Sequence, residues 1–257
     1  MRRLLIGDRK VRVRDEGESS RCPLVLVHGA AGSSVTWMDA VRRLPGQRRV
    51  VAPDLPGHGQ SDRWPEASLT VYRDFIGTVC ATLGIERAVI GGHSMGGAIA
   101  LLCALAWPER VAGLVLVATG GRLKVSPAIY TMLETAFADF PELFKAWSYS
   151  PATPVDVVDR WSAVSVQAEA DVCLADFRAL DGFDVRPRLP ELKERRIPAL
   201  VVGGEDDRLT PPKLQQELAA GLGGAQLAML PHAGHHPMHE QPQRFFAALE
   251  AFLVDVP

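Results

Sequence analysis

The sequence predicts a doubly wound, mostly parallel α/β sheet that carries a helical insertion, and three observations lead to this prediction. Short runs of Val, Ile and Leu alternate along the chain with segments of helical periodicity, as in sheets covered by helices on both faces. These runs do not alternate with polar residues, which is typical of strands buried on both faces. Residues 121–187 interrupt the alternation because they are helical in pattern and contain no convincing strand.

The predicted strands share a high content of Val, Ile and Leu and a length of a few residues. They cover residues 23–28, 49–53, 88–92, 113–118, 198–203 and 225–230. Segments of this length between turn residues are too short for buried helices. We therefore expect these strands to form the core of the sheet.

Helical patterns follow several of these strands. Residues 70–83 have an apolar stripe at Val71, Phe75, Val79 and Leu83, with a spacing of four. Residues 95–106 are almost entirely small or apolar, which is typical of a buried central helix. Two further helices are expected over residues 212–222 and 242–253.

The insertion is rich in aromatic residues and is cut into short helices by prolines. Its position between two strands predicts a cap over the carboxyl ends of the strands, where open α/β sheets place their ligand sites. We expect a core domain of residues 1–120 and 188–257 and a cap of residues 121–187. The aromatic residues are Tyr130, Phe137, Phe140, Phe144, Trp147, Tyr149, Trp161 and Phe177.

The overall charge and hydropathy exclude several kinds of partner. The formal net charge of -2 indicates neither a nucleic-acid partner nor an anionic membrane surface. No run approaches the about 20 apolar residues of a membrane span, and no signal peptide is recognisable. The expectation is a cytoplasmic protein, monomer or homodimer, with no membrane partner. The 4 cysteines have no paired spacing and are expected to be reduced thiols.

The strongest chemical signal is Gly92-His93-Ser94-Met95-Gly96, between a predicted strand and a predicted helix. This is the G-x-S-x-G pattern of a nucleophile elbow. A reversal of the chain within one residue strains Ser94 and directs its hydroxyl outward, while the two glycines avoid a collision across the turn. The pattern predicts Ser94 as a nucleophile.

A serine nucleophile requires a base, and the base is in turn oriented by an acid. His235 follows the strand of residues 225–230, and Gly234 before it allows a tight turn. The strand of residues 198–203 leads into a loop that contains Asp206 and Asp207. Either carboxylate could hold the imidazole of His235 in the required tautomer.

Two backbone N–H groups are needed to stabilise an oxyanion. We expect them to be those of Met95, at the start of the helix, and of Ala30, in the small-residue loop 28–32. The candidates for substrate contact, each weighed against simple packing, are Ala31, Trp37, Trp147 and His236.

Histidines gather near the predicted base, at His232, His235, His236 and His239. Pro237 interrupts the continuous helix that a metal site with this spacing would need, so we expect no metal. Elsewhere, His28 is expected to orient the oxyanion loop through hydrogen bonds, and His58 to belong to the turn after Asp54.

These motifs together resemble the α/β-hydrolase superfamily, in particular its esterase-like members with a helical cap. The resemblance covers nearly the whole chain and rests on His28-Gly29, the run DLPGHGQS at residues 54–61, the elbow, residues 204–211, and Gly234-His235 followed by residues 240–242. It implies the α/β-hydrolase fold. It also selects Asp207 as the acid, with Asp206 as runner-up, and His235 over His236 as the base.

The resemblance further implies hydrolysis of a carboxylic ester through an acyl-enzyme, with no cofactor. The expected partner is a small, mainly apolar ester. The same triad could instead cleave a carbon–carbon bond, a lactone or a thioester, or catalyse perhydrolysis; a non-catalytic ligand-binding relative is a further alternative. Acidic residues of the cap are expected to disfavour anionic substrates: Glu134, Asp139, Glu142, Asp156 and Asp159.

Overall fold

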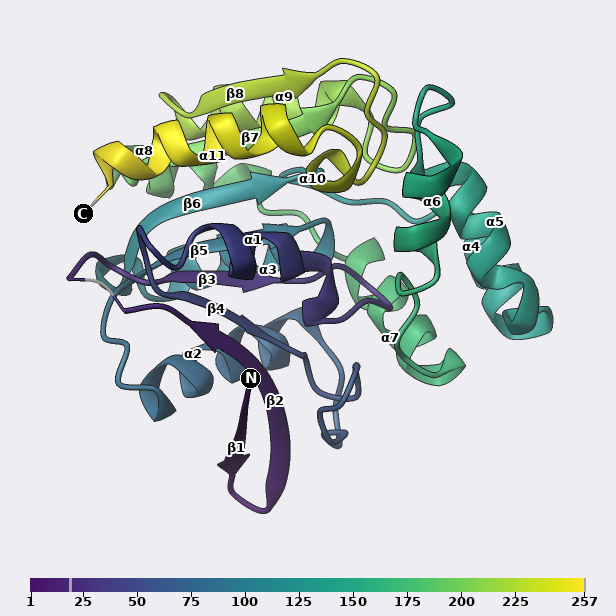
Figure 1. Ribbon diagram of the computed structural model, residues 1–257, viewed down its shortest axis with the longest axis horizontal. Helices are drawn as coiled ribbons and strands as arrows, with labels where there is room; N and C mark the ends of the chain where they lie inside the picture. Colours follow the sequence, from purple (N-terminus) through teal and green to yellow (C-terminus); the bar gives the residue numbers. More distant parts are fainter. Residues whose placement is uncertain (19, 257) are drawn as a thin grey trace.

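A computed structural model, which describes residues 1–18 and 20–256, contains an 8-stranded sheet in the order β1-β2-β4-β3-β5-β6-β7-β8 (Figure 1). From β3 onward the neighbouring strands are parallel, whereas β2 pairs antiparallel with β1 and β4. The mostly parallel sheet is therefore confirmed. Its strands are β1 (Arg2–Ile6), β2 (Arg9–Glu16), β3 (Leu24–Val27), β4 (Val50–Pro53), β5 (Ala88–His93), β6 (Val111–Val117), β7 (Ala199–Gly204) and β8 (Gln226–Leu230).

The hairpin of β1 and β2 was not predicted from the sequence. It projects from the edge of the sheet at the bottom of Figure 1. In β2 only alternate residues, Val11, Val13 and Asp15, are buried, and charged residues lie between them. An edge strand of this kind has no continuous apolar run, which is the signal that revealed the inner strands.

Helices cover both faces of the sheet because alternate residues of each strand point to opposite sides. Val25 and Val27 of β3 pack into one core with α2 (Leu69–Thr82), α3 (Met95–Ala106), α8 (Leu189–Glu194) and α9 (Pro212–Leu222). Leu24 and Leu26 pack into the other core with α1 (Met38–Arg43) and α11 (Pro242–Asp255). The sheet is therefore doubly wound, as predicted.

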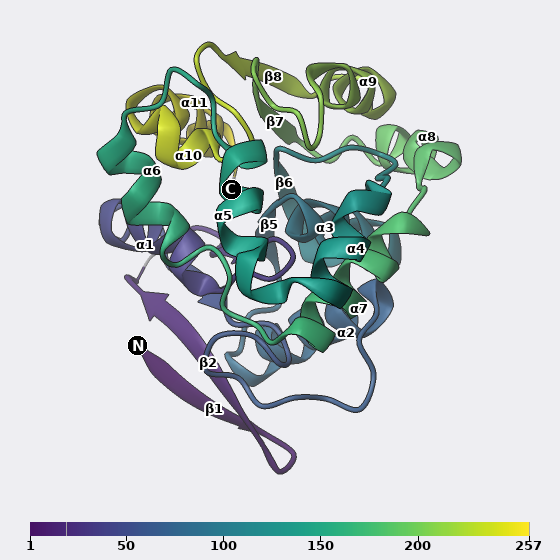
Figure 2. The same cartoon turned by 90° about the vertical axis from the view of Figure 1, so that its right-hand side faces the viewer.

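Between β6 and α8 the chain forms helices that lie over the carboxyl ends of the strands (Figures 1 and 2). The ends of this insertion join each other, because Val185 N–H donates to the Gly121 carbonyl (2.8 Å) and Leu123 N–H to that of Phe183 (3.2 Å). The insertion consists of α4 (Pro127–Thr135), η3 (Phe137–Asp139), α5 (Phe140–Ser148), α6 (Val155–Ser162) and α7 (Ala170–Asp181), and η4 (Arg186–Arg188) follows.

Aromatic rings form part of the core of this cap. The ring of Phe140 stacks on that of Phe144 with 5.2 Å between centroids and meets Phe177 edge-on at 6.1 Å. Part of the aromatic content of residues 121–187 therefore serves packing within the cap.

In the part of the chain that the structure describes, no helix has the length and apolar character needed to cross a bilayer.

Candidate active site

Ser94 occupies the turn between β5 and α3 with a strained backbone, at φ 52° and ψ −115°. The turn is possible because its glycines lack side chains: a Cβ on Gly92 would collide with the backbone of Gly96, and a Cβ on Gly96 with that of Val27. The partly exposed Ser94 lines a cavity of about 340 Å³ between the sheet and the cap. The predicted elbow is therefore present.

His235 lines the same cavity and faces a carboxylate. Its Nδ1 lies 3.0 Å from Oδ2 and 3.2 Å from Oδ1 of Asp207, and both side chains are buried. Asp206 instead accepts a hydrogen bond from the Ser150 hydroxyl of the cap at 2.6 Å. Of the two candidate acids, the structure thus brings Asp207 to the histidine.

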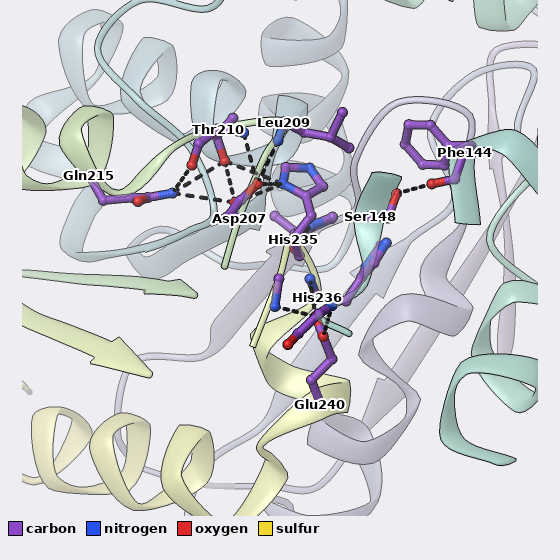
Figure 3. A network of polar contacts seen from close by, with 12 residues as sticks. Phe144, Ser148, Asp207, Leu209, Thr210, Gln215, His235, His236 and Glu240 are labelled. Carbon is purple, nitrogen blue, oxygen red and sulfur yellow. Dashed lines mark hydrogen bonds and ion pairs between the residues drawn. The ribbon is translucent and has the colours of Figure 1, made fainter. Parts of the chain in front are cut away.

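The carboxylate of Asp207 is held by further donors (Figure 3). Leu209 N–H and Thr210 N–H each donate to Oδ1 at 2.9 Å, and the Thr210 hydroxyl donates to Oδ2 at 2.6 Å. Burial alone would raise the pKa of Asp207, but the charge and hydrogen bonds of His235 and Thr210 lower it overall. An ionised Asp207 keeps the proton of His235 on Nδ1, which leaves Nε2 free to act as a base.

The sequence analysis did not identify Thr210 or Gln215 as part of this arrangement. The amide of Gln215 donates to the Thr210 carbonyl at 2.6 Å and to its hydroxyl at 3.2 Å, which orients that hydroxyl toward Asp207. The position of Thr210 within the family-like run 204–211 was the available signal. Gln215 lies on α9, outside that run, and only its hydrogen bonds to Thr210 in the structure identify it.

The loop that carries His235 is fixed on several sides. Its N–H donates to the Ser148 carbonyl of the cap at 2.6 Å, and its carbonyl lies 2.7 Å from Nε2 of His93. At Gly234 a Cβ would lie 2.5 Å from the same Ser148 oxygen, so only glycine fits there. The cap and the loop of His235 are therefore in direct backbone contact.

Glu240 is a second connection between this loop and the cap, and the sequence analysis noted it only as part of a motif. One carboxylate oxygen accepts from Gly234 N–H (2.9 Å) and His236 N–H (3.0 Å). The other oxygen accepts from Ser150 N–H (2.8 Å) and the Thr153 hydroxyl (2.6 Å). Four donors on one buried carboxylate keep the ends of both segments in place (Figure 3).

The loop of residues 28–32, which the sequence predicts to stabilise an oxyanion, lies at the cavity. Ala30 lines the cavity, Met95 begins α3, and neither N–H has an acceptor among the residues that the structure describes. His28 makes the expected hydrogen bond to this loop, where its Nδ1 donates to the Gly29 carbonyl (2.8 Å), and its Nε2 accepts from Leu55 N–H (3.0 Å). Burial lowers the pKa of His28 to about 4, so the ring is neutral at pH 7.

Of the four candidates for substrate contact, His236 lines the cavity, whereas Ala31, Trp37 and Trp147 do not. Trp37 packs into the core on the face of the sheet covered by α11, with its ring 6.4 Å from that of Phe245. Ala31 is fully buried, and Trp147 packs against the core that includes the cap. The lining of the cavity therefore does not include these three predicted contacts.

The wall of the cavity is mainly apolar, and its charged residues are cationic. Lys124 and Arg208 line it, and none of its described lining residues is acidic. The five acidic cap residues named above are absent from this lining, so the expectation that they disfavour anionic substrates has no structural basis. The apolar side is formed by Leu123, Ile129, Phe144, Phe177, Leu180 and Leu214.

Two of the four clustered histidines, His236 and His239, belong to an aromatic stack. The ring of His236 lies 4.9 Å from that of Tyr149 and 5.6 Å from that of His239, which itself stacks on Trp161 at 3.7 Å. Burial lowers the pKa of His236 and brings that of His239 to about 4. In residues 1–18 and 20–256 no group of three or more His, Cys, Asp or Glu is arranged to hold a metal ion.

Several known proteins are similar to this chain over most of its length. The model of the Alpha/beta hydrolase family matches residues 24–249. A 2-succinyl-6-hydroxy-2,4-cyclohexadiene-1-carboxylate synthase from Serratia proteamaculans is 30% identical, covering 95% of this chain and 98% of that protein. A 2-hydroxy-6-oxo-6-phenylhexa-2,4-dienoate hydrolase from Comamonas testosteroni is 28% identical, covering 93% and 90%. A solved thermophilic esterase from Thermogutta terrifontis is 25% identical, with a TM-score of 0.87 and 98% of both chains covered.

Proposed function

This chain belongs to the alpha/beta hydrolase family, and from that premise we propose that it is a serine hydrolase that cleaves a small, mainly apolar carboxylic ester through an acyl-enzyme. One observation carries the proposal. Ser94, at a strained strand-to-helix turn, opens into the same cavity as His235, whose Nδ1 is bound to Asp207. This is the arrangement of a nucleophile, a base and an orienting acid.

In the proposed reaction His235 Nε2 takes the proton of Ser94 as the oxygen attacks the ester carbonyl. The carbonyl oxygen becomes negative, and the N–H groups of Ala30 and Met95 stabilise it. Collapse of the intermediate breaks the bond to the alcohol, which leaves with the proton of His235. His235 then activates a water molecule, which releases the acid and regenerates Ser94.

The cavity supports the size and polarity of the proposed substrate. Its volume of about 340 Å³ is near the lower end of ligand pockets, and apolar side chains from α4, α5, α7 and α9 form one wall. A short acyl or aryl group would bury apolar surface there, at roughly 25 cal/mol per Å². We therefore expect short to medium acyl chains to be preferred.

The proposal is tested by release of p-nitrophenol from acetate to decanoate esters, with intact-mass analysis after an organophosphonate probe. Wild type is expected to hydrolyse the shorter esters and to gain one adduct. Ser94→Ala is expected to lose about 10³-fold or more in kcat and all labelling. Ser162→Ala, on α6 outside the cavity lining, is the matched control and keeps both. Turnover by Ser94→Ala at the wild-type rate would contradict the assignment of Ser94 as the nucleophile.

A second candidate is carbon–carbon bond hydrolysis on the same triad. The Comamonas relative is named for cleavage of a dienoate, and Lys124 and Arg208 offer cations to such a carboxylate. The loss of absorbance of 2-hydroxy-6-oxo-6-phenylhexa-2,4-dienoate measures this activity. A kcat/KM above that of every ester, lowered in Lys124→Met and Arg208→Met, would favour this candidate. An enzyme that gains no adduct and cleaves neither substrate class would instead fit a ligand-binding relative.

A further inference from the structure

A carboxylate of the cap reaches down to the core beside the oxyanion loop. Asp176 on α7 is fully buried, and three groups lie within hydrogen-bond distance of it. Ala31 N–H donates to Oδ2 at 3.0 Å, the Tyr72 hydroxyl donates to Oδ1 at 2.8 Å, and His58 Nε2 lies 2.8 Å from Oδ2. Asp176 thus joins one cap helix to the oxyanion loop, to the turn after β4 and to α2.

The contacts of the His58 ring favour an ion pair with Asp176. Its Nδ1 lies 3.0 Å from the Pro56 carbonyl while its Nε2 faces Asp176, so both nitrogens face acceptors. Only a protonated imidazole donates at both positions. Burial alone would lower the pKa of His58, but the charge and hydrogen bond of Asp176 raise it overall. The positive charge of His58 thus offsets the free-energy cost of burying the carboxylate of Asp176.

The cap holds the Ala31 residue from both sides. Its N–H is bound by Asp176, and its carbonyl accepts from Gln167 N–H of the cap at 2.6 Å. Ala31 has φ 61°, in the left-handed region, which costs an alanine about 1 kcal/mol or more. Such a conformation persists only where neighbouring groups hold it in place.

We propose that Asp176 is a positioning residue that, through Ala31, directs the adjacent N–H of Ala30 toward the oxyanion. The inference rests on the proposed serine-hydrolase function. In this arrangement the cap is part of the oxyanion hole's support as well as a lid over the substrate. Because the oxyanion forms only in the transition state, loss of Asp176 lowers kcat more than it raises KM.

The test uses Asp176→Asn and Asp176→Ala in the full-length chain. The first readout is the rate at which a fluorophosphonate labels Ser94, measured by intact mass. In this reaction the phosphoryl oxygen becomes negative and occupies the same oxyanion hole. The measurement therefore needs no natural substrate. The second readout is kcat and KM for p-nitrophenyl butyrate. Asp176→Ala is expected to lower kcat and the labelling rate by about 10- to 100-fold, with KM changed less than about threefold. Asp176→Asn, which keeps one oxygen acceptor, falls between Asp176→Ala and wild type.

Tyr72→Phe is the matched control because it removes a donor from Oδ1 and leaves the bond of Ala31 to Oδ2. It is expected to lower the melting temperature, as the Asp176 variants do, but to keep the labelling rate within about threefold. If Asp176→Ala does not fold, Asp176→Asn alone carries the comparison. Unchanged labelling in the folded Asp176 variants, or an equal loss of rate in Tyr72→Phe, overturns the positioning role alone. A wild type that neither labels nor cleaves esters overturns the proposed function and this inference with it.

Discussion

At the scale of single residues, the site depends on close approaches of backbone that only glycine permits. Gly92 and Gly96 lie against each other across the elbow, and Gly96 also lies against Val27 of β3. Ser94 between them is held at positive φ, where a side chain is strained. The packing of the elbow therefore maintains the exposure of the nucleophile.

Gly96→Ala is expected to destabilise the chain by about 3 kcal/mol or more, because the added methyl group would meet the rigid backbone of β3. Gly46→Ala is the matched substitution, since a Cβ there has nothing within 4 Å, and its effect is expected to stay within about 0.5 kcal/mol. Urea unfolding of the two variants measures the difference. Equal stability of both variants would contradict the close packing of the elbow.

A second prediction at this scale concerns the hydroxyl that holds the catalytic carboxylate. Thr210→Val keeps the side-chain shape but removes the 2.6 Å hydrogen bond to Asp207. We expect kcat to fall about 10-fold with little change in KM, because Asp207 then orients His235 less firmly. Steady-state kinetics on a p-nitrophenyl ester measure this. Thr78→Val, whose hydroxyl bonds only the Asp74 carbonyl on an exposed part of α2, should show wild-type kinetics.

At the scale of elements, the site lies where a few short segments meet. The loop after β8 contacts the end of α5 through His235 and Ser148, and Glu240 of α10 (Pro237–Glu240) reaches the segment after α5. Asp176 makes the equivalent connection between α7 and the oxyanion loop. The cap is thereby attached both to the loop of His235 and to the loop of Ala31 by buried hydrogen bonds.

Glu240→Gln tests this attachment. All four donors face oxygens of Glu240, so the amide nitrogen of glutamine must oppose two of them. We expect a loss of about 2 kcal/mol in stability and faster hydrogen exchange at the amide of Ser150. Hydrogen exchange followed by mass spectrometry measures it. Glu142→Gln, at an exposed position on α5, is the control, and protection of Ser150 equal in both variants would rule out the attachment.

At the scale of the whole molecule, buried histidines determine how stability depends on pH. His28, His93, His236 and His239 all have pKa values lowered in the first place by burial, to about 4 for His28 and His239. Their neutral forms stabilise the fold above the ordinary histidine pKa of about 6.5. This contribution is lost as the pH falls from there toward the lowered values, since the unfolded chain binds protons that the folded chain excludes. His58, with its pKa raised overall, behaves in the opposite way: its protonated form stabilises the fold fully below about pH 6.5, and this contribution is lost as the pH rises from there toward the raised pKa.

The free energy of unfolding is therefore expected to fall between about pH 6.5 and pH 4.5, by up to about 1.4 kcal/mol per pH unit for each of these four histidines. Urea unfolding at a series of pH values measures the slope. His236→Phe keeps the aromatic stack and should reduce the slope by about one proton. A flat profile over this range would show that these rings titrate normally.

Features that depend on a local pattern of residues could be predicted from the sequence. The inner strands, the central helix over Met95–Ala106, the elbow at Ser94 and the loop position of His235 all follow from residues adjacent along the chain. The charged edge hairpin β1–β2 was not predicted, because its residue pattern is not that of a buried strand. Residue patterns left Asp206 and Asp207 both open, and only the family resemblance preferred Asp207.

Which side chains meet across long separations in the sequence is seen only in the folded chain. The fold placed Asp207 rather than Asp206 on His235, turned Trp37 into the opposite core, and brought Asp176 to Ala31 and His58. These contacts join segments that are far apart along the chain, and their separation in sequence says little about their distance in space. These contacts form because folding buries apolar surface and because each buried polar group requires a hydrogen-bond partner. Both effects depend on the whole fold, so a local pattern of residues does not predict them.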